Sequence, residues 1–131
     1  MSETSQNFDL SNWVTQARKG LLELCIVATL SKGEMHAYDL VKHLAGIKAL
    51  VITEGTIYPL LSRLRSAGLL QSRLEESSLG PVRKYYALTD TGREAVRLMG
   101  AYWRELVEGV GELVESEHNH DELDTRGETE P

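Results

Sequence analysis

Hydrophobic residues recur at steps of three and four along most of the chain, which predicts helices. The first helical pattern extends from Trp13 to Ala28 and crosses Gly20, a residue that weakens a helix. A second helix fits residues 36–45. Residues 47–52 are apolar, few and rich in β-branched side chains, which favours an extended segment.

The stretch TEGTIYPLLSRLRSAGLL, residues 53–70, predicts a third helix with unequal faces. Its apolar face holds Ile57, Leu60, Leu61 and Leu64. The opposite face is small, and it is flanked by Thr56, Tyr58, Arg63 and Arg65. Such a helix fits the DNA major groove, which offers acceptors to arginine. Taken alone, the pattern also describes an ordinary amphipathic surface helix.

Pro59 lies inside this third helical pattern and has no backbone N–H. Thr53 is a plausible N-cap, in which case Pro59 would fall within the helix. Either the first turn is distorted, or the regular helix begins near Thr56. Both alternatives place Tyr58 at the N-terminal end of the helix.

Two stretches of alternating polar and apolar residues, 69–75 and 82–88, follow the third helix. The turn-rich sequence ESSLGP joins them, so we expect a β-hairpin. Its second strand contains two cations, Arg83 and Lys84, followed by two tyrosines. Because neighbours in a strand point to opposite faces, we expect one tyrosine in the core and Tyr85 at the surface.

Thr89 and Asp90 cap a last helix whose apolar stripe continues to Leu113. A helix of about 25 residues is about 37 Å long, which is more than a small domain covers. The stripe therefore needs a partner, most simply a second copy of the chain. The residues expected at this dimer seam are Trp13, Leu98, Met99, Tyr102, Trp103, Leu106 and Val110.

Composition and charge are compatible with a nucleic-acid-binding protein. The net charge is −6, yet residues 12–111 contain 13 Lys and Arg against 10 Asp and Glu, while residues 112–131 contain eight acids and Arg126. The folded part is therefore mildly basic. No apolar run is long enough for a membrane span or a signal core, so a cytoplasmic location is expected.

These elements predict a mainly α (α+β) protein with a winged helix-turn-helix and a long C-terminal dimerisation helix. We expect a disordered N-terminus (1–11), a DNA-binding domain (12–88), the dimerisation helix (89–115) and a disordered acidic tail (116–131). In this fold the third helix enters the major groove, and the hairpin, or wing, lies on the DNA backbone. Winged helices also serve as protein-binding modules, which stays an alternative.

The sequence contains no clear motif for a catalytic site or for a metal site. The chain shows no nucleophile–base pair, glycine-rich phosphate loop or paired carboxylates at useful spacing, so we expect no enzyme. His118 and His120 lie in the polar tail and fall short of a preformed metal site. Cys25 lies in an apolar run and is expected to be buried. We expect no metal and no cofactor.

Three segments resemble the PadR-like transcriptional regulators. They are RKGLLELCIVATLSKGEMHAYDL, EGTIYPLLSRLRSAGLL and RKYYALTDTGREAV, which fall between about Arg18 and Ala95. The run Gly55-Thr56-x-Tyr58-Pro59, joined to a basic and aromatic wing and to Thr-x-x-Gly, is a specific combination. The resemblance implies a homodimeric repressor on double-stranded DNA with an inverted-repeat operator, whose C-terminal helix pairs the subunits.

The helix pattern, the wing and the resemblance together name the DNA-binding candidates: Tyr38, Gly55, Thr56, Tyr58, Arg63, Arg65, Arg83, Lys84 and Tyr85. Thr56 and Tyr58 are expected at or near bases, and the arginines and Lys84 at phosphates. Ala37 stands where the family usually has glycine. At the wing tip Pro81 and Val82 replace frequent glycines, which leaves a minor-groove contact open.

Trp103 has two interpretations. An aromatic side chain in a helical stripe is usually a core residue, which favours a role in the dimer seam. The resemblance offers another role, because some multidrug-binding relatives stack flat ligands on a tryptophan of this helix. Met99 and Trp13 would then line the same site, and a flat aromatic effector or stress signal would release the repressor from its operator.

Overall fold

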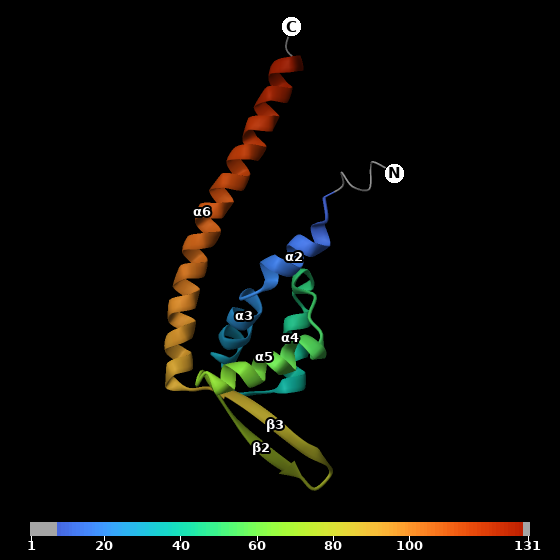
Figure 1. Cartoon of the computed structure of the whole chain (residues 1–131), viewed down its shortest axis with the longest axis vertical. Coiled ribbons are helices and arrows are strands. Elements are labelled where there is room, and N and C mark those ends of the chain that lie inside the picture. Colours follow the sequence, from blue (N-terminus) through green and yellow to red (C-terminus); the bar gives the residue numbers. More distant parts are fainter. Residues whose placement is uncertain (1–7, 130–131) are drawn as a thin grey trace. The chain divides into compact units, whose positions relative to one another are not determined.

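The computed structural model describes the backbone of residues 8–129 and the side chains of residues 8–116. In chain order the elements are α2 (Leu10–Arg18), α3 (Leu21–Leu30), β1 (Met35–His36), α4 (Ala37–Ala45), η1 (Lys48–Leu50), α5 (Glu54–Ser66), β2 (Leu70–Ser77), β3 (Gly80–Leu88) and α6 (Asp90–Thr129) (Figure 1). They form two compact units, Met1–Val96 and Arg97–Pro131. This arrangement confirms the mainly α winged helix-turn-helix with a long C-terminal helix.

The single helix expected from Trp13 to Ala28 is wrong, because the chain forms two helices there. Gly20 interrupts the helical path with a φ of 81°, a left-handed conformation that glycine adopts at little cost. Helix α3 then buries a face of its own rather than continuing the predicted stripe. The residues it buries are Leu22, Ile26, Val27, Thr29 and Leu30. Cys25, expected to be buried, is half-buried.

The extended segment expected at residues 47–52 is also wrong. Residues 48–50 form the 3-10 turn η1, and Leu50 is buried. Val51 follows in the left-handed region with a φ of 51°, which is uncommon for a β-branched residue. A short apolar run fits a strand or a tight turn equally well, so the pattern could not distinguish them.

The core lies where α3, α4 and α5 pack on one another and on the hairpin of β2 and β3. Helix α5 contributes its predicted apolar face, in which Ile57 and Leu61 are fully buried and Leu60 is half-buried. Each fully buried leucine or isoleucine contributes about 1.5–3 kcal/mol. The opposite face of α5 is consequently held outward.

The N-terminal end of α5 begins as the threonine cap predicts. The Thr53 hydroxyl accepts a hydrogen bond from the Thr56 backbone N–H at 3.3 Å, and the two threonine hydroxyls are 2.9 Å apart. The regular helix begins at Glu54, so Pro59 lies inside it. Pro59 has no N–H for the carbonyl of Gly55, four residues before it.

The three strands form one antiparallel sheet in the order β1-β3-β2. The hairpin expected from the alternating residues is confirmed, with Ser72 opposite Tyr86 and Leu74 opposite Lys84. Tyr86 is buried, as expected for one of the two tyrosines. The strand β1 was not predicted, because two residues are too few to show an alternating pattern.

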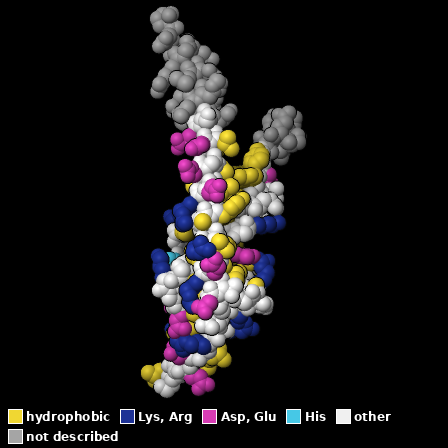
Figure 2. Space-filling view, turned by 90° about the vertical axis from the view of Figure 1, so that its left-hand side faces the viewer, with side chains coloured by type: hydrophobic (Ala, Val, Ile, Leu, Met, Phe, Trp, Pro, Cys, Tyr) yellow, Lys and Arg dark blue, Asp and Glu magenta, His cyan; other side chains and the backbone are white. Residues whose placement is uncertain are grey.

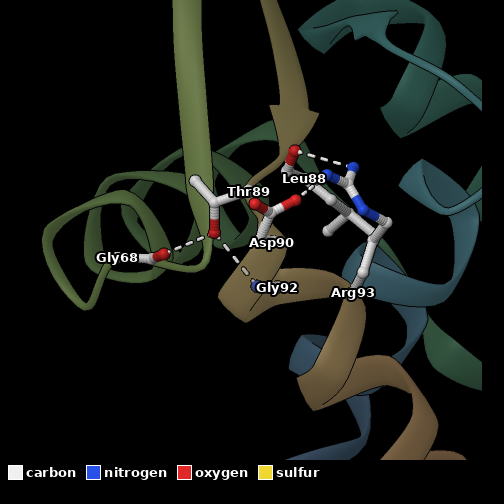
Figure 3. A network of polar contacts seen from close by, with 6 residues as sticks. All are labelled: Gly68, Leu88, Thr89, Asp90, Gly92 and Arg93. Atoms are coloured by element: carbon white, nitrogen blue, oxygen red, sulfur yellow. Dashed lines mark hydrogen bonds and ion pairs between the residues drawn. The ribbon is translucent and has the colours of Figure 1, made fainter.

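Thr89 joins the end of α5 to the start of α6 (Figure 3). Its hydroxyl donates to the Gly68 carbonyl at 2.6 Å and accepts from the Gly92 N–H at 3.0 Å, so it caps α6 as predicted. Its own N–H donates to the Leu69 carbonyl at 3.0 Å. A Cβ atom on Gly92 would lie only 2.1 Å from that carbonyl oxygen. Glycine is therefore required at this joint.

Helix α6 continues to Thr129, beyond the end expected near residue 115. Side chains are described only as far as residue 116, so those of the expected acidic tail lie almost wholly outside the described part. Residues 1–7 and 130–131 lie outside it altogether. The disorder expected for residues 1–11 and 116–131 stays a prediction.

Gly92→Ala should lower the free energy of unfolding by about 2–3 kcal/mol, because the new methyl group displaces the Leu69 carbonyl. Gly55→Ala is the matched control, since its Cβ atom would have one ordinary contact, 3.9 Å from the Thr53 hydroxyl oxygen. Its stability should equal or slightly exceed that of the wild type. Urea unfolding at a fixed protein concentration measures both. Equal stability of the two variants would contradict the requirement for glycine at position 92.

Candidate nucleic-acid interface

Two tyrosines are exposed on neighbouring helices of the helix-turn-helix. Tyr38 of α4 is 50% exposed and Tyr58 of α5 is 40% exposed. The pKa of Tyr58 is raised, mainly by partial burial and also by the charges of Glu54, Tyr86 and Tyr38. Three tyrosines from α4, α5 and β3 therefore lie within electrostatic reach of one another.

The backbone around Tyr38 is fixed by His36, the N-cap of α4. The Tyr38 N–H donates to Nδ1 of His36 at 3.2 Å. Lys42, one turn later in α4, places its Nζ 5.5 Å from the centroid of the Tyr38 ring, which is a cation–π distance. Lys42 was not among the predicted site residues. Its spacing of four from Tyr38 was the signal that could have identified it.

The N-terminal end of α5 brings together the other predicted contact residues. Gly55 is exposed, and its missing side chain leaves room for a close approach. Thr56 is half-buried, and its hydroxyl lies within hydrogen-bond distance of Thr53. The free N–H groups at a helix start favour phosphate. A small residue, a threonine and Tyr58 thus occupy the end of the helix suited to a groove.

The two arginines of α5 are held by neighbouring elements. Arg63 forms an ion pair with Glu23 of α3. Arg65 donates from Nη1 to the hydroxyl of Ser72 on β2 at 3.1 Å. The sequence predicted both arginines as outward cations and did not indicate either partner, because Glu23 lies far away along the chain and serine is common at surfaces.

Arg83 and Lys84 do not lie on one face of the hairpin, since neighbouring strand residues alternate. Lys84 shares a face with the buried Tyr86, and its Nζ is 5.7 Å from that ring centroid. This face is the one turned to α5, because Arg65 reaches Ser72, the cross-strand partner of Tyr86. Arg83 therefore lies on the opposite face.

The opposite face also holds Tyr85, which was expected at the surface and is half-buried instead, because its ring packs on neighbouring side chains. Its ring packs edge-on against His36 with centroids 5.6 Å apart, and the guanidinium carbon of Arg73 is 4.7 Å from its centroid. Arg73 also binds both carboxylate oxygens of Glu34, one through Nε at 3.0 Å. These contacts fasten the hairpin to the segment that precedes β1.

The ion pair between Arg73 and Glu34 shifts both groups toward their charged forms. The hydrogen bonds from Arg73 lower the pKa of the Glu34 carboxyl, and the same bonds raise the pKa of Arg73. A small hollow of about 120 Å³ adjoins the pair. Its lining residues are Glu34, Gln71, Ser72, Arg73, Tyr85 and Ala87. Of these, Glu34, Arg73 and Tyr85 are engaged in holding the hairpin.

The wing tip is apolar and acidic. Leu74, Leu79 and Val82 are exposed, Leu79 by 96%, and the acidic Glu75 and Glu76 lie beside them. Figure 2 shows such hydrophobic and acidic side chains at its lower end, where the hairpin tip lies. No Lys or Arg occurs among residues 74–82. Apart from Arg73, which is paired with Glu34, the cations of the wing are therefore Arg83 and Lys84.

The predicted seam residues are divided between the two units. In the second unit they follow one another at steps of three and four along α6, and most are exposed. Their exposed fractions are 55% for Leu98, 66% for Tyr102, 38% for Trp103, 41% for Leu106 and 47% for Val110, while Met99 is half-buried. Trp13 belongs to the first unit and is 57% exposed. An unpartnered apolar stripe is thus present on α6 itself.

The described part of the chain shows neither a metal cluster nor a membrane-spanning helix. Between residues 8 and 116, no three His, Cys, Asp or Glu side chains gather as metal ligands. His118 and His120 lie outside the described side chains. None of the described helices is both long and apolar enough to span a bilayer.

Comparison with known proteins places these features in a family. The model of the transcriptional regulator PadR-like family matches residues 26–98. A PadR-like transcription factor from Bacteroides fragilis is 42% identical, with 78% of this chain and 98% of that chain covered and a TM-score of 0.66. A PadR family transcriptional regulator from Eggerthella lenta is 38% identical, with 81% and 92% covered and a TM-score of 0.69.

A PadR-like transcriptional regulator from Bacillus cereus is also 38% identical, with 76% of this chain and 96% of that chain covered and a TM-score of 0.68. No curated protein matches the chain. The matched segment contains α4, α5, the hairpin and the Thr89 joint, which are the elements that carry the predicted DNA contacts. The chain belongs to the PadR-like family of transcriptional regulators, which bind DNA.

Proposed function

We propose that the protein is a sequence-specific, homodimeric repressor that binds double-stranded DNA at an inverted-repeat operator. The observation that carries the proposal is the outward N-terminal end of α5. There Tyr58 lies within electrostatic reach of Tyr38 on α4 and of Tyr86 on the wing, and Lys84 approaches the Tyr86 ring. A helix end with small and hydrogen-bonding side chains fits the major groove, and the flanking groups suit phosphates.

We assign the contacts by the faces on which the side chains lie. Thr56 and Tyr58 contact bases or their immediate surroundings, and Gly55 permits the close approach. Tyr38, Arg65 and Lys84 contact the DNA backbone. Arg83 and Tyr85 lie on the other face of the hairpin, so their contribution to DNA binding is smaller.

The dimer rests on the apolar stripe of α6. Side chains such as Leu106 and Val110 are about half exposed in a single chain, and a second copy would cover them. A twofold dimer sets two recognition helices about 34–36 Å apart, which matches successive major grooves on one side of DNA. An inverted-repeat operator follows from that symmetry.

The first test is selection from a pool of random duplexes at two salt concentrations, followed by sequencing of the bound fraction. We expect enrichment of one palindromic motif, because a symmetric dimer reads two equal half-sites. Salt-sensitive binding without a motif would contradict sequence-specific recognition. No binding by the folded dimer at low salt would favour the alternative, a winged-helix module that binds a protein partner.

Lys84→Ala and Arg83→Ala form a matched pair for the wing. Lys84→Ala should weaken binding to all duplexes and reduce the slope of log K against log salt by about 0.9 per protomer, because one phosphate contact is lost. Arg83→Ala should change both quantities less, since Arg83 lies on the face turned away from α5. Fluorescence anisotropy at several salt concentrations measures the binding constant and the salt slope of each variant. A larger loss of affinity in Arg83→Ala than in Lys84→Ala would mean that the Arg83 face of the wing, and not the Lys84 face, contacts DNA.

We also propose that a flat aromatic molecule releases the repressor by binding near Trp103. This indole is 38% exposed and less exposed than Tyr102 beside it, so it is partly enclosed yet reachable. Trp13→Phe leaves Trp103 as the remaining tryptophan. Flat aromatic compounds should quench or shift its fluorescence and weaken operator binding. Unchanged fluorescence across a panel of such compounds would leave Trp103 as a dimer residue.

A further inference from the structure

The two arginines of the recognition helix are held by partners of different charge. Arg65 donates to a neutral hydroxyl, so its positive charge stays uncompensated there. Arg63 is paired with a carboxylate, that of Glu23, so its charge is compensated within the molecule. The Arg63 side chain is 63% exposed, and it lies two turns after Thr56 on the same side of α5, where a phosphate beside that side of the helix could reach it.

Glu23 is a fixed anion rather than a mobile one. It lies in the first turn of α3, where the helix dipole favours a negative charge. Its side chain is only 28% exposed, and α3 is anchored by Ile26 and Val27, which are fully buried. Withdrawal of Arg63 would leave this half-buried carboxylate without its partner, which costs free energy.

A phosphate that recruits Arg63 must therefore compete with Glu23. Binding to DNA of arbitrary sequence depends almost wholly on cation–phosphate contacts. The loss of one available cation per protomer weakens that binding directly. In the operator complex, base contacts fix α5 in the groove and so determine which phosphates lie nearby. In that complex a freed Arg63 would add less binding free energy, because α5 is fixed and Arg63 can reach only the phosphates that happen to lie beside it.

We propose that Glu23 is a specificity-determining residue, which holds Arg63 away from phosphates and so lowers the affinity for non-operator DNA. The inference rests on the proposed function in DNA binding. Glu23 itself touches no DNA in this scheme and acts through Arg63. Arg63, expected from the sequence to contact phosphate, is then a masked cation in the wild-type protein.

Glu23→Gln tests the proposal, because it removes the charge and keeps the size of the side chain. Affinity for a duplex without the selected motif should rise about three- to tenfold at 0.1 M salt, and the slope of log K against log salt should steepen by about 0.9 per protomer. Operator affinity should rise less than about twofold, and the specificity ratio should fall accordingly.

The double variant Glu23→Gln/Arg63→Ala separates masking from a general change of charge. Its affinity for the motif-free duplex should return to the wild-type value. Arg63→Ala alone should not strengthen binding, because it removes a cation and leaves the Glu23 carboxylate unpaired. Arg65→Ala is the matched control and should weaken binding in every background, because its partner is neutral. Thermal unfolding of each variant identifies any that fail to fold. Glu23→Ala also removes the negative charge and is a second variant in which non-operator affinity should rise.

Unchanged affinity and salt slope in Glu23→Gln would overturn the inference. So would an equal gain in the Arg63→Ala background, or an equal gain for operator and motif-free DNA. Failure of the masking role and failure of DNA binding would give different results. Binding by the wild type with no effect of Glu23→Gln overturns the inference alone, whereas no binding by either protein overturns the proposed function together with it.

Discussion

Burial of one face of α5 is the interaction on which the rest of the structure depends. Ile57 and Leu61 have no exposed surface, and they fix the rotation of the helix about its own axis. Because neighbours in a helix are about 100° apart, this rotation sets Thr56 and Tyr58 on the two flanks of the buried face, where Thr56 is half-buried and Tyr58 is exposed. The DNA-binding candidates on α5 are therefore presented by hydrophobic packing behind them, and the polar contacts in front are free to serve recognition.

Charged side chains also join elements at the surface, outside the apolar core. Arg73 and Glu34 are 39 positions apart, and they tie the hairpin to the segment before β1. Arg65 ties the same hairpin to α5 through Ser72. Surface ion pairs are individually weak, commonly about 0–1 kcal/mol. The hydrogen bond from Arg65 to Ser72 identifies the face of the wing that is turned to the recognition helix.

The sequence predicted those parts of the molecule whose patterns are local. The periodicity of α5, the alternation in the hairpin and the Thr89 cap each lie within one segment, and all three are present. The Gly20 break was not predicted, since helical periodicity on both sides continues across it. The partners Glu23 and Glu34 could not be found either, because ion pairs between distant segments leave no periodic signal. Those pairs decide which cations remain available for DNA.

The contrast between Arg63 and Arg65 shows why a count of cations does not describe a nucleic-acid interface. Both are arginines of one helix and are exposed, so sequence reasoning gives them the same role. In the structure Arg63 is paired with the carboxylate of Glu23, whereas Arg65 donates to the hydroxyl of Ser72. A regulator searches among a large excess of non-operator sites, so a cation that strengthens non-operator binding more than operator binding lowers selectivity. Compensation of such a cation by a fixed carboxylate raises selectivity without altering the base contacts.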